Sequence, residues 1–419
     1  MLKVCIISDY LPRYHKIWSG AELISVSLAD MLKDKRCRVF FITTPFDFKV
    51  SDFKYEIHPV HTPLKKLGTL SRNFPLDIVA IRGIYRILKR ERPDIVHINS
   101  KYLYLSALIA ALCLGIPRVV TVPDYFIFCP TTFIRRPNKE NCLSYHGANC
   151  YKCISILSEG YLNRIIKNLP NIFLKLILYL RAREFNYFNS KVNTFIALSN
   201  FSRQRLIEYG INPGKIQILY HYKLSELKET REDTKNPAVL FVGWLSEENG
   251  VDILIDAFLE VIKTNKMTRL YLVGTGKEKF VAQLKAKIIK YAASDNILFL
   301  GKKENSETIS IISSCDLVVV PHQWPKEFGP VILLEALAMG KPVIASKIGA
   351  TEEYLKENDT GFLIEDYRNP SAFSAKIDYL LKNPQIATEM GKRGKVSVSF
   401  LFNDFVSEKI FELYKSLIN

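Results

Sequence analysis

Two glutamates near the start of a short helix are the residues whose types and spacing best suit chemistry on a phosphorylated ligand. Glu327 lies just before the expected helix, and Glu335 lies eight positions later, about two turns along the same face. Pro330 suits the first turn, and Gly340 suits the end. The free N–H groups and positive dipole end of such a helix can hold a diphosphate, while the carboxylates accept hydrogen bonds from sugar hydroxyls. Taken alone, the spacing favours an ordinary surface helix carrying two glutamates, so the surrounding sequence decides.

Apolar strands alternate with helical segments on both sides of this stretch. The strands expected in the first half are Lys3–Ser8, Val39–Thr43, Asp94–Ile98, Val119–Val122, Thr194–Leu198 and Ile216–Leu219. Those expected in the second half are Val239–Val242, Leu270–Val273, Ile297–Leu300, Leu317–Val320 and Val343–Ala345. Such alternation builds parallel sheets covered by helices. The sequence therefore predicts an α/β protein with two doubly wound, Rossmann-like domains.

The length of 419 residues also favours two cores over one. We expect residues 1–221 to form the first domain and residues 237–395 the second, joined by a charged, apolar-poor linker over 222–236. The end of the chain, 396–419, holds a last helix that we expect to pack back on the first domain. Two such domains facing a central cleft suit a nucleotide and a second substrate.

Gly20 lies between the first strand and the helix that follows it. A glycine there lets the backbone approach a ligand at the carboxyl edge of the sheet, where open α/β sheets bind their ligands. A tight turn explains the glycine equally well.

The formal net charge of +16 points to an anionic partner. No zinc-finger, RRM or helix-turn-helix pattern accompanies the charge, so a nucleic-acid binder is disfavoured. The N-terminus lacks the apolar region of a signal peptide, and no run of about 18 apolar residues indicates a membrane span. We therefore expect a cytoplasmic protein, with an anionic membrane surface as a further partner.

The membrane prediction depends on Leu162–Arg183, which mixes large apolar side chains with basic ones and contains no acidic residue. Its basic residues are Arg164, Lys167, Lys175, Arg181 and Arg183. Such a helix, divided at Pro170, can lie along an anionic bilayer at the inner face of the membrane. The alternative is an amphipathic helix that covers the first sheet and exposes its charges to water.

Eight cysteines without a secretory signal favour reduced thiols or a metal site over disulfides. Cys129, Cys142, Cys150 and Cys153 share one loop-rich insertion over 129–153, and the last pair has the spacing of a zinc knuckle. A structural zinc ion and four unrelated thiols stay equally open. Catalytic zinc is disfavoured because four thiolates leave no open position. The other four cysteines, among them Cys113, are expected to be buried.

Several motifs in one order resemble glycosyltransferase family 4, whose members have the GT-B fold. In the second half these motifs are GWLSEENG at Gly243–Gly250, LVGTG at Leu272–Gly276, FLG at Phe299–Gly301, Glu327 through Glu335, GKPVIAS at Gly340–Ser346 and GATEE at Gly349–Glu353. In the first half, Ser19–Glu22, Pro93–His97 and Gly115–Pro117 are similar to that family's first domain.

The resemblance implies a retaining hexosyltransferase of glycan or polysaccharide biosynthesis. Such an enzyme moves a sugar from a nucleotide-sugar donor to a glycan or lipid-linked acceptor without a catalytic metal or other cofactor. It implies that Glu327 touches the sugar, that Glu335 holds the donor ribose, and that amides near Gly329–Val331 hold the diphosphate. The implied donor-side residues are Glu335, Gly20, Gly243, Trp244, Asn249, Gly274, Gly329, Pro330 and Val331. Asp124 is expected on the acceptor side.

Three positions depart from the family pattern. Trp244 and Asn249 stand where the family usually has an arginine and a lysine on the donor diphosphate, and Pro123 replaces a histidine before Asp124. Losing two cations from the leaving group would weaken catalysis by several kcal/mol in a sheltered site. The alternatives are therefore a non-catalytic protein that keeps the sugar-binding cleft and, with poorer motif agreement, a sugar-nucleotide epimerase or a phosphorylase.

Overall fold

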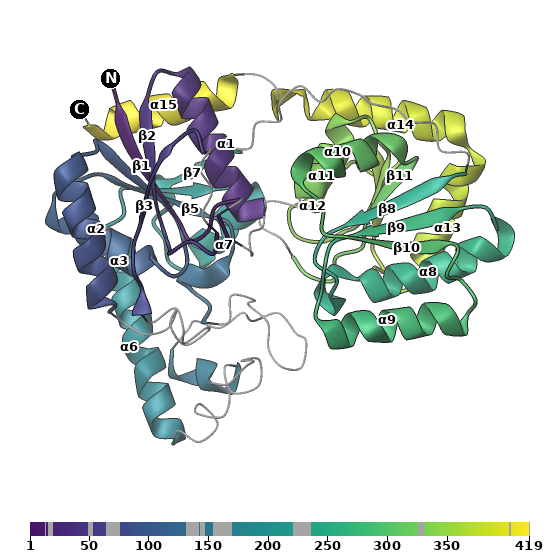
Figure 1. Cartoon of the computed structure of the whole chain (residues 1–419), viewed down its shortest axis with the longest axis horizontal. Coiled ribbons are helices and arrows are strands. Elements are labelled where there is room, and N and C mark those ends of the chain that lie inside the picture. Colours follow the sequence, from purple (N-terminus) through teal and green to yellow (C-terminus); the bar gives the residue numbers. More distant parts are fainter. Residues whose placement is uncertain are drawn as a thin grey trace. The chain divides into compact units, whose positions relative to one another are not determined.

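The computed structural model describes the chain except residues 13, 16–19, 49–52, 64–75, 131–141, 143–146, 154–169, 221–235, 326–330, 402–403 and 419. The chain divides into two compact units, Met1–Lys223 with Asp404–Asn419, and Leu224–Asn403. Figure 1 shows each unit as a sheet covered by helices. The expected linker lies almost wholly outside the described residues.

The first unit contains a seven-stranded parallel sheet in the order β3-β2-β1-β4-β5-β6-β7. Its strands are β1 (Lys3–Ser8), β2 (Arg38–Thr43), β3 (Glu56–Pro59), β4 (Ile95–Asn99), β5 (Arg118–Val122), β6 (Thr194–Ala197) and β7 (Ile216–Ile218). Its helices are α1 (Gly20–Asp34), α2 (Ile78–Glu91), α3 (Tyr104–Cys113), α6 (Asn171–Ser190), α7 (Asn200–Glu208) and α15 (Phe405–Ile418), with short 3-10 turns η2 (Tyr125–Ile127), η3 (Ala148–Cys150) and η4 (Pro213–Lys215). The strand order reverses between β1 and β4, which makes this the switch point of the sheet.

The second unit contains a six-stranded parallel sheet in the order β10-β9-β8-β11-β12-β13. Its strands are β8 (Ala238–Val242), β9 (Arg269–Val273), β10 (Ile297–Gly301), β11 (Leu317–Val320), β12 (Val343–Ser346) and β13 (Gly361–Ile364). Its helices are α8 (Val251–Thr264), α9 (Glu278–Lys290), α10 (Asn305–Ser314), α11 (Val331–Ala338), α12 (Thr351–Tyr354), α13 (Pro370–Lys382) and α14 (Pro384–Ser397), with 3-10 turns η5 (Glu247–Asn249) and η6 (Ser399–Leu401). Here the order reverses between β8 and β11.

Both sheets confirm the α/β prediction of two doubly wound domains. All expected strands are present within a residue or two. The edge strands β3 and β13 were not predicted. Strand β3 (EIHP) has no continuous apolar run and ends at a proline, and β13 begins at a glycine.

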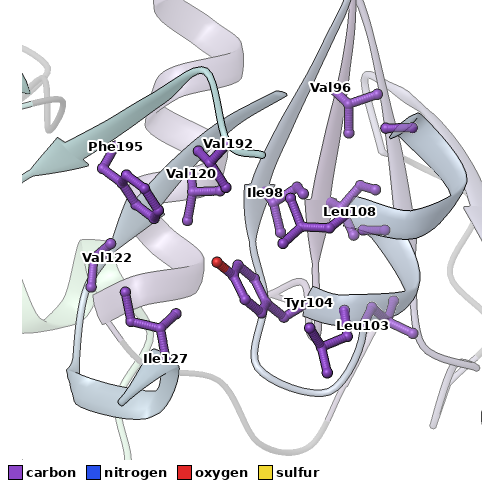
Figure 2. Close-up of a cluster of buried hydrophobic side chains, with 14 of the residues drawn as sticks. Val96, Ile98, Leu103, Tyr104, Leu108, Val120, Val122, Ile127, Val192 and Phe195 are labelled. Carbon is purple, nitrogen blue, oxygen red and sulfur yellow. The ribbon is translucent and has the colours of Figure 1, made fainter. Parts of the chain in front are cut away.

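The core of the first unit packs α2 and α3 against the buried side chains of β1, β2, β4, β5 and β6. Figure 2 shows Tyr104 of α3 in the middle of this cluster, between Ile98 of β4 and residues of β5 and β6. Tyr104 is fully buried, and its hydroxyl donates to Asn189 Oδ1 at 2.6 Å. A buried tyrosine hydroxyl needs such a partner, so this bond fixes α6 against α3.

The C-terminal helix packs on the first unit. Tyr414 of α15 is fully buried, and its hydroxyl bonds to Nδ1 of the equally buried His97 on β4. The other ring nitrogen of His97 bonds to Thr121 Oγ1 at 2.7 Å. The segment from 396 to 403 instead belongs with the second unit, since α14 continues to Ser397.

Two expectations about single side chains are wrong. Cys113 is exposed, because it is the last residue of α3 and lies past the packed part of that helix. Arg181 is only 2% exposed and not among the solvent-facing charges of its helix. Its guanidinium donates to the carbonyls of Phe126 (2.7 Å) and Phe128 (3.3 Å), so it anchors η2 to α6.

Candidate functional site

The switch point of the second sheet brings two loops into backbone contact. The loop after β8 reaches the loop after β11, where Gln323 N donates to Glu248 O at 2.9 Å. Gly250 has φ +68°, and a Cβ at this position would lie 1.9 Å from Pro321 O. Any side chain here would overlap the neighbouring carbonyl, so the approach of these loops requires glycine.

The loop after β9 packs on the loop after β8 in the same way. Gly243 N donates to Val273 O at 2.9 Å, and Leu245 N donates to Thr275 O at 2.8 Å. Gly274 has φ +137°, and a Cβ on it would lie 1.9 Å from Gly243 O. Three loops at the carboxyl ends of β8, β9 and β11 thus form one backbone-rich surface at the place where open α/β sheets bind ligands.

Trp244 and Asn249, which stand in place of two cations, have different roles in this loop. Asn249 is 8% exposed, and its Nδ2 donates to Trp244 O at 2.7 Å. The side-chain amide of Asn249 therefore stabilises the backbone of its own loop. Trp244 leaves 52% of its surface exposed, which presents a large aromatic face beside the glycines.

Glu335 lies on α11, which is almost entirely buried. Seven of its eight residues, Ile332–Ala338, are buried, and Glu335 itself is 5% exposed. The alternative of a surface helix with ordinary glutamates is therefore wrong for Glu335. A buried carboxylate is costly unless polar or charged groups stabilise it, so Glu335 holds a defined position on this apolar helix.

The expected helix opening is described only from Val331 onward. Val331 is the first helical residue and is partly exposed. Glu327, Gly329 and Pro330 lie outside the described residues, as does Lys326. The helix ends as expected at Gly340, where Lys341 N donates to Ala336 O at 2.9 Å.

A buried carboxylate joins the loops at the switch point of the first sheet. Asp9, directly after β1, is 4% exposed and accepts hydrogen bonds from the loop after β4. Its donors are the Ser100 hydroxyl, Lys101 N at 2.6 Å and Tyr102 N at 3.1 Å. Its own carbonyl also accepts from the hydroxyls of Thr43 (3.1 Å), the last residue of β2, and Thr44 (2.5 Å), the residue after it. One residue therefore ties three strand ends together.

An ion pair lies at the same edge. Lys101 Nζ pairs with Asp124 Oδ2, and the two side chains are 31% and 23% exposed. The other oxygen of Asp124 accepts from Phe126 N at 3.0 Å, which caps η2. Since Asp9 fixes the backbone of Lys101, both charges hold defined positions while remaining accessible. Sequence reasoning missed Asp9 and Lys101, although polar residues directly after strand ends were the available signal.

Gly20 begins α1 at this edge. The buried Asn99, at the end of β4, donates to Ala21 O at 2.8 Å and to Ser25 Oγ at 2.7 Å. The first turn of α1 is thereby fixed beside the carboxyl ends of β1 and β4. Gly20 and Asp124 lie on the first unit, whereas Gly243, Trp244, Asn249, Gly274, Val331 and Glu335 lie on the second.

The four cysteines of the insertion occupy one neighbourhood of the first unit. Cys129 is buried beside Tyr125, with Cys142 and Tyr209 packed against them. The hydroxyl of Tyr209 donates to Cys142 O at 3.2 Å. Burial raises the pKa of Cys150 to about 11, and the nearby Cys129 and Cys153 raise it too.

In the described part of the chain, no three of these four sulfur atoms lie within 4.8 Å of one another. Among the described residues, only Glu56, His58 and Glu91 bring three ligand atoms within 4.8 Å of one another. Lys3 and Arg90 pair with Glu91, and Arg38 pairs with Glu56, so ion pairs account for that group. Structural zinc at the cysteines stays a prediction, which metal analysis of the purified protein would test.

Comparison with known proteins places both halves of the chain in related families. Residues 18–221 match the family model described as Glycosyltransferase Family 4, and residues 223–397 match Glycosyl transferases group 1. The N-acetyl-alpha-D-glucosaminyl L-malate synthase of Bacillus anthracis is 23% identical over 402 residues, which cover 95% of this chain and 93% of that protein.

Solved structures show the same fold. HepE of Anabaena, in complex with UDP and glucose, superposes with a TM-score of 0.69 at 19% identity and covers 99% of this chain and 100% of its own. The sucrose-phosphate synthase of Thermosynechococcus elongatus gives a TM-score of 0.70 at 18% identity and covers 100% of this chain and 99% of its own.

Proposed function

The chain belongs to glycosyltransferase family 4 and is a glycosyltransferase with the GT-B fold, and from this premise we propose that it moves a hexose from a nucleotide-sugar to a glycan or lipid-linked acceptor with retention of configuration. The observation that carries the proposal is the surface at the switch point of the second unit. There Gly250 and Gly274 allow three loops to meet backbone to backbone, and the helix that follows β11 carries the buried Glu335. Backbone amides and a helix start suit a diphosphate, and the complex of HepE with UDP supports a nucleotide donor.

In the proposed reaction the bond between the anomeric carbon and the diphosphate breaks as the acceptor oxygen attacks, and the proton of the acceptor hydroxyl passes to the departing diphosphate. Positive charge develops on the sugar and negative charge on the departing diphosphate. Amides near Gly329–Val331 stabilise that negative charge, an effect worth roughly 10²–10³ in rate for one oriented donor. Glu335 accepts hydrogen bonds from the donor ribose, and Glu327 from the sugar.

The cations that the family usually places on the diphosphate need a replacement in this proposal. Lys277 is exposed and follows Gly276, which bridges to Leu245 in the loop after β8. Lys302 is exposed directly after β10. Of the two, we assign the role to Lys277 because its loop packs on the loop that bears Trp244. The face of Trp244 would then stack on the nucleobase or the sugar.

In the first unit we propose that the pair of Lys101 and Asp124 positions the acceptor. An ammonium and a carboxylate held side by side can donate to one sugar hydroxyl and accept from its neighbour. Pro123 removes the imidazole that the family usually has here, and Lys101 supplies a hydrogen-bond donor at the end of the neighbouring strand β4. No metal ion takes part in the proposed reaction.

The proposal is tested by incubating the purified protein with a panel of nucleotide-sugars and glycan or membrane-lipid acceptors. We expect transfer or slow hydrolysis of one donor, and the anomeric configuration of the product should match that of the donor. Glu335→Ala should weaken nucleotide binding, whereas Glu389→Ala, a control at an exposed residue of α14, should leave it unchanged. Unchanged affinity in Glu335→Ala would show that the donor lies elsewhere.

A non-catalytic binding protein is the second candidate, suggested by Trp244 and Asn249. Saturable binding of a nucleotide-sugar without turnover on any acceptor would favour it. The full-length similarity to a synthase argues against it.

We further propose a cytoplasmic protein that associates with the inner face of the membrane. In the part of the chain that the structure describes, no helix is both long enough and apolar enough to cross a membrane. Association would therefore depend on the protein surface, where α6 offers a specific feature.

A further inference from the structure

Helix α6 carries two apolar faces. Leu174, Leu178 and Phe185 are buried against the first unit, together with Arg181 and Asn189. A second set of large apolar side chains is exposed, and we call it the exposed face of α6. Its members are Ile172 (72% exposed), Phe173 (55%), Leu176 (52%), Tyr179 (47%), Leu180 (45%) and Tyr187 (57%).

The two sets lie on opposite sides of the helix. At 3.6 residues per turn, the exposed set falls within an arc of about 120°, and the buried set is centred roughly opposite. Figure 1 shows α6 projecting beyond the sheet of the first unit. Single exposed apolar residues are normal on a protein surface, but six on one helix face mark an interaction site.

Basic and aromatic side chains accompany this face. Arg183 lies within the arc, with its guanidinium 5.9 Å from the centre of the Tyr179 ring. Lys191, just after the helix, lies 5.3 Å from the Tyr187 ring. Lys175 lies beside the arc and 4.7 Å from the Tyr151 ring. Lysine, arginine and tyrosine of this kind are the side chains that favour the interface between water and lipid.

Charge distinguishes between the occupants that an apolar face could have. Glu184 is the only acidic residue of α6, and burial raises the pKa of its carboxyl. A second copy of this chain, packed through the same face, would bring further basic residues and no acidic residue of the exposed face to pair with Arg183 and Lys175. An anionic bilayer would meet them with phosphates, and the net charge of +16 acts in the same direction.

We propose that the exposed face of α6 docks the first unit on an anionic lipid bilayer. The apolar side chains enter the boundary between headgroups and acyl chains, and Lys175, Arg183 and Lys191 contact the headgroup phosphates. This site is independent of the donor site on the second unit, so either proposal can fail alone.

Co-flotation of the full chain with vesicles tests the proposal. We expect binding to vesicles of phosphatidylcholine with 30% phosphatidylglycerol, little binding to pure phosphatidylcholine, and weakening on going from 0.1 to 0.5 M salt. Ile172→Glu combined with Leu176→Glu should lower the vesicle-bound fraction at least tenfold, and Arg183→Glu should lower it severalfold. Ile289→Glu is the matched control, because Ile289 is equally exposed (69%) on α9 of the second unit.

Equal flotation of the double variant and the wild type would overturn the proposal, as would failure of the wild type to bind anionic vesicles. Light scattering adds one more outcome, since a wild-type dimer that the double variant abolishes would make this face a protein interface. All substituted residues are exposed, so circular dichroism should show folded variants. Nucleotide binding, measured on the same samples, should stay unchanged.

Discussion

The two switch points of the molecule join their strand-end loops in different ways. In the first unit, the loops after β1 and β4 are joined by the carboxylate of Asp9, which accepts from a hydroxyl and two backbone amides. In the second unit, the loops after β8 and β11 meet at Gly250, where no side chain fits. One edge is thus held by a side-chain charge and the other by close backbone approach.

This difference bears on what each edge can bind. A glycine surface lets a ligand such as a diphosphate approach the backbone closely, because no side chain intervenes. A charged edge with the accessible pair of Lys101 and Asp124 suits a neutral ligand rich in hydroxyl groups. The contrast supports donor binding on the second unit and acceptor binding on the first.

The largest loss of stability should come from adding a side chain at Gly250, where the loops after β8 and β11 meet. Gly250→Ala should destabilise the second unit by ~3–5 kcal/mol, because the left-handed conformation and the overlap with Pro321 O act together. Gly301→Ala, with φ +71° and no atom within 4 Å of the added Cβ, should cost only ~1–2 kcal/mol. Urea unfolding measures the loss in free energy of unfolding for both variants. Equal losses would show that the close approach of Gly250 to Pro321 O adds no cost of its own.

The matching change in the first unit is Asp9→Asn. The amide keeps the shape of the carboxylate but turns an NH₂ group toward the donors of the loop after β4, so we expect a loss of ~2–3 kcal/mol. The unfolding transition of the first unit should shift while nucleotide affinity stays constant. A drop in nucleotide affinity would show that the two edges are not independent.

A functional contrast should follow from Lys101→Met. Exposed ion pairs add little stability, so the free energy of unfolding should change by less than ~1 kcal/mol. Transfer to acceptor should fall by roughly 10–100-fold, as for loss of a charge-assisted contact. Donor hydrolysis and nucleotide affinity should persist. Lys89→Met, at an exposed lysine in the last turn of α2, is the control. A loss of nucleotide binding in Lys101→Met would contradict the acceptor role.

The smallest effect concerns a charge pair at the amino end of the first sheet. Hydrogen bonds from Lys3 and then Arg90 lower the pKa of Glu91 from an ordinary value of 4.5 to about 2. Because the folded-state pKa is depressed, its stabilisation is present above pH 4.5 and is lost as the pH falls toward 2. Glu91→Gln should therefore cost about 1 kcal/mol at pH 7 and progressively less below pH 4.5. Urea unfolding at several pH values measures this loss of stability. Activity at pH 7 should not change, because the proposed sites lie at the carboxyl ends of the strands and Glu91 lies at the amino end of the first sheet.

The sequence predicted the strands and the class of fold because apolar periodicity is local. Runs such as Leu317–Val320 are buried on both faces and are visible as continuous apolar segments. The family motifs were equally visible, because they are short runs of residues whose glycines stand at fixed spacings along the chain. Helix limits were less exact: the expected helical segment ended at Arg183, whereas α6 begins at Asn171 and continues to Ser190.

The sequence by itself determined two parallel sheets, the positions of their strands and the family to which the chain belongs. Only the tertiary structure decided that Asp9 bonds the residues around Lys101, that Lys101 meets Asp124, and that Asn249 serves its own loop. It also decided which apolar face of α6 is buried, since both faces carry large apolar residues. The physical reason is that periodicity specifies local conformation, whereas the order in which crossovers place strands decides which distant side chains become neighbours.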